Sequence, residues 1–182
     1  MTKQIALFGG SFNPPHIGHT LAIIWALSQR VDKVLVVPAF KHEFGKDLAP
    51  FQHRVEMCRL AFGWLPNVVI STAEQALGHS RTFDTICHLY NVEGRSNIQL
   101  RLLIGTDILE QKDQWYKWEE VEKLAPPIVL GRIGYPKRGV HNYLPDVSSS
   151  CIRQMLVNRE STDEVLHPDV YRYIKEWRLY IA

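Results

Sequence analysis

Short apolar runs alternate with longer segments of helical periodicity along most of this chain. Five runs suit buried strands: Ile5 to Phe8, Lys33 to Val37, Val68 to Ser71, Gln99 to Ile104 and Ile128 to Leu130. Helices are predicted between them, over Ile17 to Gln29, Pro50 to Phe62 and Thr82 to Tyr90, and in short pieces through Leu124. This alternation predicts a doubly wound, Rossmann-like parallel α/β sheet of about five strands in the order 3-2-1-4-5, with helices on both faces.

The last third of the chain predicts a helical segment after the sheet. A polar stretch with Gly and Pro runs from Gly131 to Pro145, and N-cap candidates from Asp146 to Ser149 then open a helix to about Val157. A final helix opens at Pro168, and we expect its Val170, Tyr171, Ile174 and Trp177 to pack in the core. We see no internal repeat, low-complexity tract or linker, so residues 1–182 are expected to form a single domain.

The turn after the first predicted strand reads Gly9-Gly10-Ser11-Phe12-Asn13-Pro14-Pro15-His16-Ile17-Gly18-His19. A strand that ends in paired glycines and reopens as a helix forms a cradle for phosphate, because backbone N–H groups at a helix start favour negative charge. His16 and His19 are three residues apart and share one helix face, so both can reach the same polyphosphate. The turn lacks the Gly-Lys-Ser/Thr end of a P-loop and the Gly-x-Gly-x-x-Gly of a dinucleotide fold.

A second polar turn, Gly105-Thr106-Asp107, follows the fourth predicted strand. In open α/β sheets, ligands bind beyond the carboxyl ends of the strands where the strand order reverses. With the order 3-2-1-4-5, the ends of strands one and four are neighbours. The two turns are therefore expected to border one crevice.

Composition restricts the partners and the cellular location that we expect for this chain. A formal net charge of +2 is too small to argue for a nucleic-acid partner, and no apolar run approaches membrane-spanning length. Cys58, Cys87 and Cys151 have no metal-ligand spacing, which indicates a reducing compartment. The first strand starts within a few residues of Met1, which leaves no room for a signal peptide, and a cytoplasmic location is expected. The sequence leaves open whether the chain forms a homo-oligomer.

The pattern Gly-x-x-x-Pro-x-His-x-Gly-His resembles the signature of the nucleotidyltransferase superfamily. The chain resembles, more narrowly, the bacterial nicotinate-nucleotide adenylyltransferase family. The resemblance runs in order through nearly the whole chain, over Arg81-Thr82-Phe83-Asp84-Thr85, Gly105-Thr106-Asp107, Trp115-Tyr116-x-Trp118-Glu119, Arg132-x-Gly134-Tyr135 and Val147-Ser148-Ser149-Ser150-Cys151-Ile152-Arg153.

That resemblance implies adenylyl transfer from ATP to nicotinate mononucleotide, giving a dinucleotide and pyrophosphate in NAD biosynthesis, and it leaves open whether nicotinamide mononucleotide also serves as acceptor. His16 and His19 would donate hydrogen bonds to ATP phosphates, and Arg153 would add a fixed charge. ATP would also be bound by Gly9, Gly10, Ser11, Phe12, Gly18, Gly105, Asp107, Arg132, Ser148 and Ser149. Mg²⁺ is expected to arrive on ATP, because no carboxylate cluster suggests a dedicated cage.

Plainer interpretations of some of these residues stay open. Ser148 to Ser150 also suit a helix cap, and Asp107 could cap a helix instead of facing a ribose. Arg132 could be a solvated loop charge instead of lying near adenine. The family's usual basic residue after strand two is missing, and Lys46 is the best substitute by spacing, ahead of Lys41 and His42.

The pyridine ring is expected to stack on Trp115, while Trp118, at helical spacing from it, packs in the core. Thr82 would border the ring's acid or amide substituent, and Thr85, in the same segment, is also expected to bind the mononucleotide. The alternatives are another adenylyltransferase, such as pantetheine-phosphate adenylyltransferase, or a nucleotide-sensing module without turnover. The paired tryptophans argue against the first, and the intact His16 and His19 argue against the second.

Overall fold

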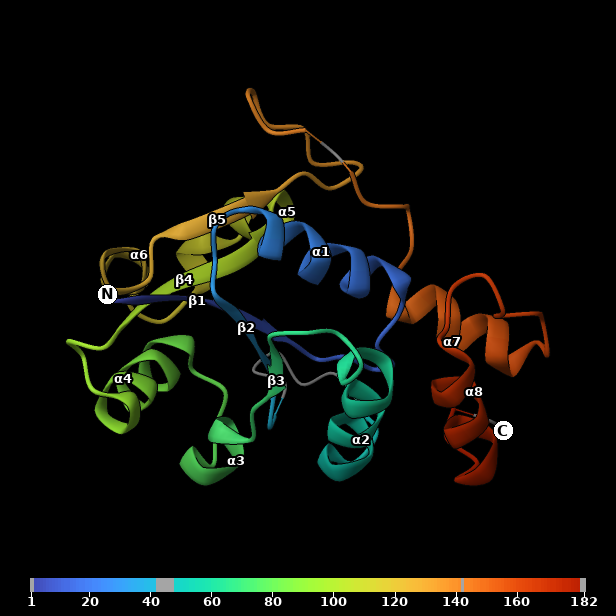
Figure 1. Cartoon of the computed structure of the whole chain (residues 1–182). Coiled ribbons are helices and arrows are strands. Elements are labelled where there is room, and N and C mark those ends of the chain that lie inside the picture. Colours follow the sequence, from blue (N-terminus) through green and yellow to red (C-terminus); the bar gives the residue numbers. More distant parts are fainter. Residues whose placement is uncertain (1, 42–47, 142, 181–182) are drawn as a thin grey trace.

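The computed structural model describes residues 2–41, 48–141 and 143–180. Its centre is one parallel sheet in the order β3-β2-β1-β4-β5, which confirms the predicted strand order (Figure 1). The strands are β1 Lys3–Gly10, β2 Lys33–Pro38, β3 Val68–Ile70, β4 Ile98–Gly105 and β5 Pro127–Leu130. The helices are α1 Ile17–Ser28, α2 Phe51–Phe62, α3 Ala73–Leu77, α4 Thr82–Glu93, α5 Thr106–Glu110, the 3₁₀ turn η1 Lys112–Gln114, α6 Trp118–Leu124, α7 Ser149–Val157 and α8 Pro168–Glu176.

The apolar strands are buried because helices cover both faces of the sheet. Along β1, Ala6 points to one face, and Ile5 and Leu7 point to the other, as the period of two requires. The first face packs against α1, α2, α7 and α8, with Ile23, Met57, Ile152 and Ile174 in its core. The second face packs against α3, α4 and α6, with Ala73, Ile86 and Val121 in its core. The two layers leave the carboxyl ends of the strands open.

The predicted bounds of the strands and helices hold to within about one turn. The structure differs from the sequence prediction in two other respects. Helix α3 was not predicted, since its five residues are too few to show helical periodicity. The expectation that Tyr171 and Trp177 pack in the core is wrong, because they are 37% and 54% exposed. Helix α8 is nine residues long and rests on α2 along one narrow stripe, so only Val170 and Ile174 are fully buried.

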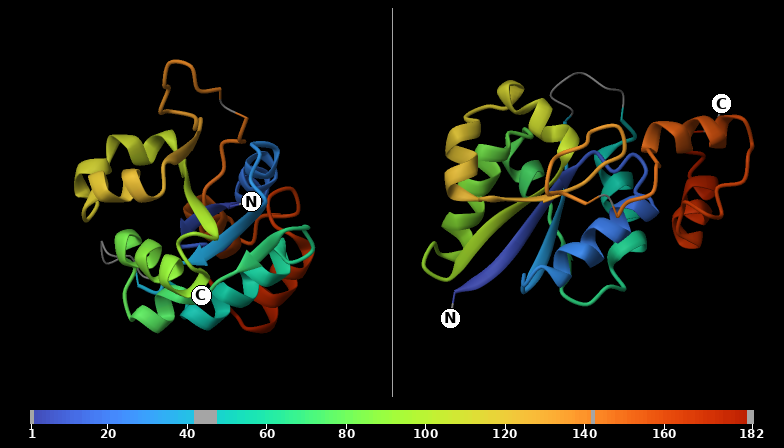
Figure 2. Two further views of the ribbon diagram at one scale, coloured as in Figure 1. Left: turned by 60° about the vertical axis from the view of Figure 1, so that its left-hand side comes forward. Right: turned by 90° about the horizontal axis from the view of Figure 1, so that it is seen from above.

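The segment between β5 and α7 joins the far edge of the sheet to the C-terminal helices (Figure 2). It ends where α7 meets the start of α1, so residues from both ends of the sequence border the same open edge. Within the described part of the chain, no helix is both long enough and apolar enough to cross a membrane.

Candidate active site

A cavity of about 1280 Å³ lies beyond the carboxyl ends of β1 and β4, where the strand order reverses. Small-molecule sites usually measure ~300–1000 Å³, so this one has room for more than one small ligand. Among the described residues that line it, five cationic side chains face two carboxylates: Lys41, Arg81, Arg132, Arg153 and Arg178 against Glu74 and Asp107. Positive side chains are thus concentrated around the cavity, whereas the whole chain has a formal net charge of only +2, and such a concentration suits a site for polyanions.

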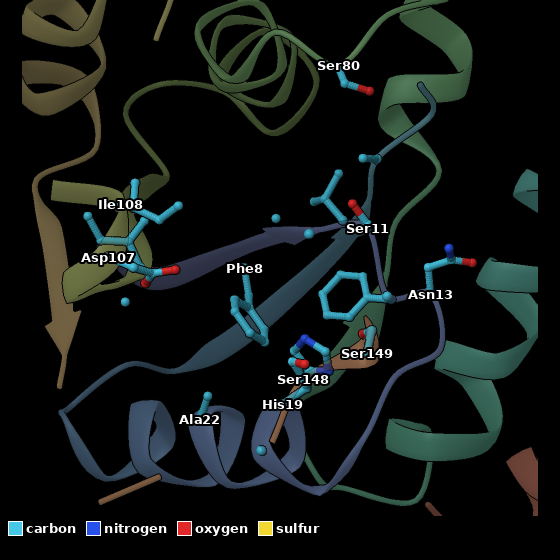
Figure 3. A pocket seen from close by; sticks show the side chains of 18 of the residues that line it. Phe8, Ser11, Asn13, His19, Ala22, Ser80, Asp107, Ile108, Ser148 and Ser149 are labelled. Carbon is cyan, nitrogen blue, oxygen red and sulfur yellow. The ribbon is translucent and has the colours of Figure 1, made fainter. Parts of the chain in front are cut away.

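The histidine corner lies at the start of α1. His16 is the N-cap residue and His19 follows one turn later, with the two rings stacked at 3.8 Å between centroids. The backbone N–H of His16 donates to Nδ1 of His19 over 3.2 Å. Because Nδ1 accepts, the neutral ring of His19 carries its proton on Nε2 and can donate only from there. His19 borders the cavity beside Phe8, with Ser148 and Ser149 next to it (Figure 3).

Both histidines are held neutral. Burial, followed by the positive charge of Arg132, lowers the pKa of His16 from 6.5 to about 4. Burial also lowers the pKa of His19 well below 6.5, with His16 and Arg132 as further causes. Nδ1 of His16 is buried and has no hydrogen-bond partner among the described residues. The corner thus offers neutral hydrogen-bond donors instead of imidazolium charges.

The glycines of this corner leave backbone exposed to a ligand. A Cβ on Gly9 would meet nothing within 4 Å, because that residue faces the open cavity. A Cβ on Gly18 would lie 3.0 Å from Val147 and 3.1 Å from the His16 ring, so this position packs the histidine tightly. The Phe12 ring is buried at 1% exposure and packs against the rings of Phe8 and His19.

The serine–arginine corner lies at the start of α7. Ser148 caps the helix by accepting from the N–H of Cys151, so the cap interpretation holds for this hydroxyl. Ser149 and Ser150 follow at the first two helical positions, where backbone N–H groups have no intrahelical acceptor. Both residues line the cavity, so these N–H groups are placed to bind an anion.

The two corners are in direct contact. Oγ of Ser149 donates to the carbonyl of Pro14 over 2.8 Å, and Nη1 of Arg153 donates to the carbonyl of Asn13 over 2.8 Å. The N–H of Ile17, at the start of α1, donates to the carbonyl of Val165 over 2.9 Å. One polyphosphate can therefore touch both helix starts at once.

Across the cavity, Asp107 and Arg132 form an ion pair. Nη1 of Arg132 donates to the Asp107 carboxylate over 2.7 Å, and the backbone N–H of Arg132 donates to Oγ1 of Thr106 over 3.0 Å. A Cβ on Gly105 would collide with the Asp107 carboxylate, so a larger residue there would displace this carboxylate from its place beside Arg132. Figure 3 shows Asp107 on the opposite side of Phe8 from His19. Asp107 therefore lies apart from Ser148 and Ser149, while the positive charge of Arg132 still acts on His16 and His19.

Trp115, Thr82 and Thr85 line a third part of the cavity. Trp118 is 9% exposed and belongs to the core, and Trp115 meets it edge-on at 5.7 Å, so the predicted packing of Trp118 is confirmed. The hydroxyl of Thr85 is turned inward, within hydrogen-bond distance of the Glu74 carboxylate and the Arg81 carbonyl. Thr85 thus supports this wall through its hydroxyl.

Sequence reasoning missed the buried groups that hold the loops around the cavity. Glu74 accepts from the N–H of Phe40, besides its contact with Thr85. Arg54 is 1% exposed and donates to the carbonyls of Ser11 and Ala49 over 2.9 Å. Burial lowers the pKa of Arg54, whereas nearby Tyr180, Cys58 and Glu74 raise it. No local sequence signal marks these residues, because their partners lie in other segments.

The basic loop after β2 is described only in part. Lys41 lines the cavity, and its backbone N–H donates to Oγ of Ser80 over 3.0 Å. Lys46, expected to supply the basic side chain, and His42 lie outside the described residues.

Comparisons with known proteins agree with this geometry. Residues 7–155 match the sequence model of the cytidylyltransferase-like family. A protein of Anaeromyxobacter dehalogenans (strain 2CP-C) named probable nicotinate-nucleotide adenylyltransferase is 42% identical over 98% of this chain and 97% of its own. The nicotinate-nucleotide adenylyltransferase of Bacillus subtilis (strain 168) is 33% identical over 98% of both chains. The Plasmodium falciparum nicotinic acid mononucleotide adenylyltransferase, solved with NaAD, has the same fold: its TM-score is 0.84 at 19% identity, covering 98% of this chain and 97% of that one.

Proposed function

The chain belongs to the nicotinate-nucleotide adenylyltransferase family, within the cytidylyltransferase-like proteins, and on that premise we propose that it is a nucleotidyltransferase of NAD biosynthesis. It transfers the adenylyl group of ATP to nicotinate mononucleotide, and residues 1–182 act as one nucleotidyltransferase domain. The phosphate oxygen of the mononucleotide attacks the α-phosphorus of ATP. The bond from that phosphorus to the β-phosphate bridging oxygen breaks, and pyrophosphate leaves with the bond's electron pair.

The observation that carries this proposal is the contact between the histidine corner and the serine–arginine corner. The acceptor phosphate is already an anionic nucleophile, so the protein needs no nucleophile of its own. Its task is to hold two mutually repelling polyanions in line, which can supply ~7–11 kcal/mol of the barrier reduction. The cationic lining of the cavity offsets the repulsion.

The departing pyrophosphate is stabilised from both corners. The neutral His19 donates from Nε2 to a phosphate oxygen, while the N–H groups of Ser149 and Ser150 bind the β/γ end. Among the described residues, two of the five N–H donors of Arg153 bond within the protein, to Asn13 and Ser150. Because Arg153 lines the cavity, we assign the remaining donors to the phosphates. Gly9 gives the phosphates access to backbone.

The adenosine of ATP and the pyridine ring of the mononucleotide are assigned to the other walls of the cavity. Asp107, fixed by Arg132, accepts from a ribose hydroxyl of ATP, and the turn at Arg132 borders the adenine. Trp115 stacks on the pyridine ring, a contact worth ~1–3 kcal/mol by analogy with base stacking. Thr82, at the first position of α4, borders the ring substituent.

Mg²⁺ would be bound by the phosphate oxygens of ATP. Among the described residues, no group of three or more His, Cys, Asp or Glu side chains is arranged to hold a metal ion. The donors around the cavity thus suit Mg²⁺ held by ATP and water, where it would offset phosphate charge.

The test is pyrophosphate release from ATP with nicotinate mononucleotide, and separately with nicotinamide mononucleotide. We expect pyrophosphate release with nicotinate mononucleotide. The rate with nicotinamide mononucleotide measures how strongly the site discriminates between the acid and the amide on the ring. No release with either acceptor, or release only with phosphopantetheine, would reject the proposal.

A further inference from the structure

Asn13 joins the phosphate turn to three other parts of the chain. Its side-chain oxygen Oδ1 accepts from the hydroxyl of Tyr180 over 2.6 Å and from the N–H of Ala49 over 3.0 Å. Its backbone carbonyl accepts from Arg153 over 2.8 Å. Asn13 is 3% exposed, so its polar groups depend on protein partners. This one residue sets the relative position of the histidine corner, the Arg153 guanidinium and the C-terminal turn.

Tyr180 reaches Asn13 from 167 residues away in the sequence. It follows α8 in a turn that is closed by the N–H of Leu179 donating to the carbonyl of Ile174 over 3.0 Å. Tyr180 also lines the cavity, next to Asn13 and Arg153. Burial raises its pKa, so the phenol keeps its proton and remains a donor at neutral pH. The hydroxyl is thus a fixed donor behind the phosphate turn.

We propose that Tyr180 is a positioning residue for the triphosphate of ATP, acting through Asn13 on the Arg153 guanidinium. Without the phenol hydroxyl, Asn13 loses its 2.6 Å hydrogen bond to the C-terminal turn. The turn that carries the Asn13 carbonyl is then held less firmly, and so is the Arg153 guanidinium that donates to this carbonyl. A guanidinium displaced by a fraction of an ångström loses in-line contact with phosphate oxygens. This inference rests on the proposed function for the identity of the ligand.

The test compares Tyr180→Phe with Tyr173→Phe. Tyr173 is the matched control, because its hydroxyl also makes a partly buried hydrogen bond, at 2.8 Å with Nδ1 of His53, but this residue does not line the cavity. Removing the Tyr180 hydroxyl should weaken ATP binding and lower kcat/KM for ATP by about 3- to 10-fold, the range for one lost hydrogen bond. The KM for the mononucleotide should stay within about twofold of wild type. Tyr173→Phe should leave all of these values unchanged.

A double-mutant cycle with Arg153→Lys tests the route through Asn13. Lysine cannot reproduce the guanidinium contact with the Asn13 carbonyl, so the effect of Tyr180→Phe on ATP affinity should largely disappear in that background. A full Tyr180→Phe effect in the Arg153→Lys background overturns the inference. The inference is also overturned if Tyr173→Phe weakens ATP binding as much as Tyr180→Phe does, because both hydroxyls would then act only on the stability of the C-terminal helix and turn.

ATP affinity is measured by calorimetry without the acceptor, which separates this inference from the proposed function. If the wild type binds ATP but releases no pyrophosphate, the proposed function fails and the comparison of affinities still decides the role of Tyr180. If Tyr180→Phe binds ATP as tightly as wild type, the positioning role fails, whatever the turnover. If the wild type does not bind ATP, both fail.

Discussion

Acidification should unfold this protein partly through His16. The ring is 7% exposed, and burial together with Arg132 lowers its pKa from 6.5 to about 4. In the unfolded chain the same imidazole takes up a proton as the pH falls below about 6.5. The unfolded state therefore binds more protons than the folded state between about pH 6.5 and pH 4, and stability falls with pH across that window.

The size of the effect follows from the shift. A pKa lowered from 6.5 to about 4 corresponds to ~3 kcal/mol when the whole window is crossed. Between about pH 7 and pH 5, the part of the free energy of unfolding that depends on His16 should fall by ~2 kcal/mol. His19 shifts in the same direction and adds to the loss in the wild type.

The assay is urea unfolding at about pH 7 and pH 5 for the wild type and His16→Asn. Asparagine keeps a favourable N-cap but cannot titrate, so the variant should lose ~2 kcal/mol less than the wild type over this range. Val147→Ala is the control, since it loosens the packing at Gly18 and keeps both histidines. It should show the wild-type pH dependence. Equal losses in the wild type and His16→Asn would refute the buried, neutral His16.

Three further predictions concern turnover and binding, all measured by steady-state pyrophosphate release. His19→Ala should lower kcat by ~10²–10³-fold, as for loss of one transition-state donor, and loss of its Nδ1 hydrogen bond and ring packing should also lower the urea midpoint while the protein stays folded without urea. Trp115→Ala should raise the apparent constant for the mononucleotide more than that for ATP, because the proposed stacking partner of the pyridine is lost. Gly105→Ala should raise the apparent constant for ATP by about 10-fold or more, because its Cβ pushes the Asp107 carboxylate off Arg132.

Each of these has a contrary outcome. Near-wild-type turnover of His19→Ala would remove this ring from the reaction. Equal effects of Trp115→Ala on both substrates would count against stacking on the pyridine. Unchanged ATP binding in Gly105→Ala would mean that the Asp107 carboxylate does not touch the nucleotide.

The sheet could be predicted because its signals are local. Short Val/Leu runs such as Lys33–Pro38 favour buried strands, and alternation with helices then favours a parallel order. The helix starts at Ile17 and Ser149 were marked by the glycine turn and by serine caps. Helix α3 escaped notice because one turn and a half of helix carries no periodic pattern.

Only the turns that border the site could be predicted from the sequence. Motifs located both helix starts, and the strand order brought them together. The buried partners could not be found this way, because Arg54 reads as an ordinary basic residue of an amphipathic helix. Tyr180 likewise reads as one more aromatic side chain near the last helix. What makes each special is an acceptor in another segment, and long-range pairing leaves no trace in local periodicity.

The hydrogen bonds from Ile17 to Val165 and from the serine–arginine corner to the glycine turn also affect when the site can form during synthesis of the chain. Chains leave the ribosome N-terminus first, and their early parts can begin to fold before the late parts exist. A nascent chain extending to Leu130 contains the glycine turn and every strand among the described residues, but it lacks the serine–arginine corner. If both corners hold the triphosphate as proposed, capture of ATP must wait until the last fifty or so residues have emerged and docked.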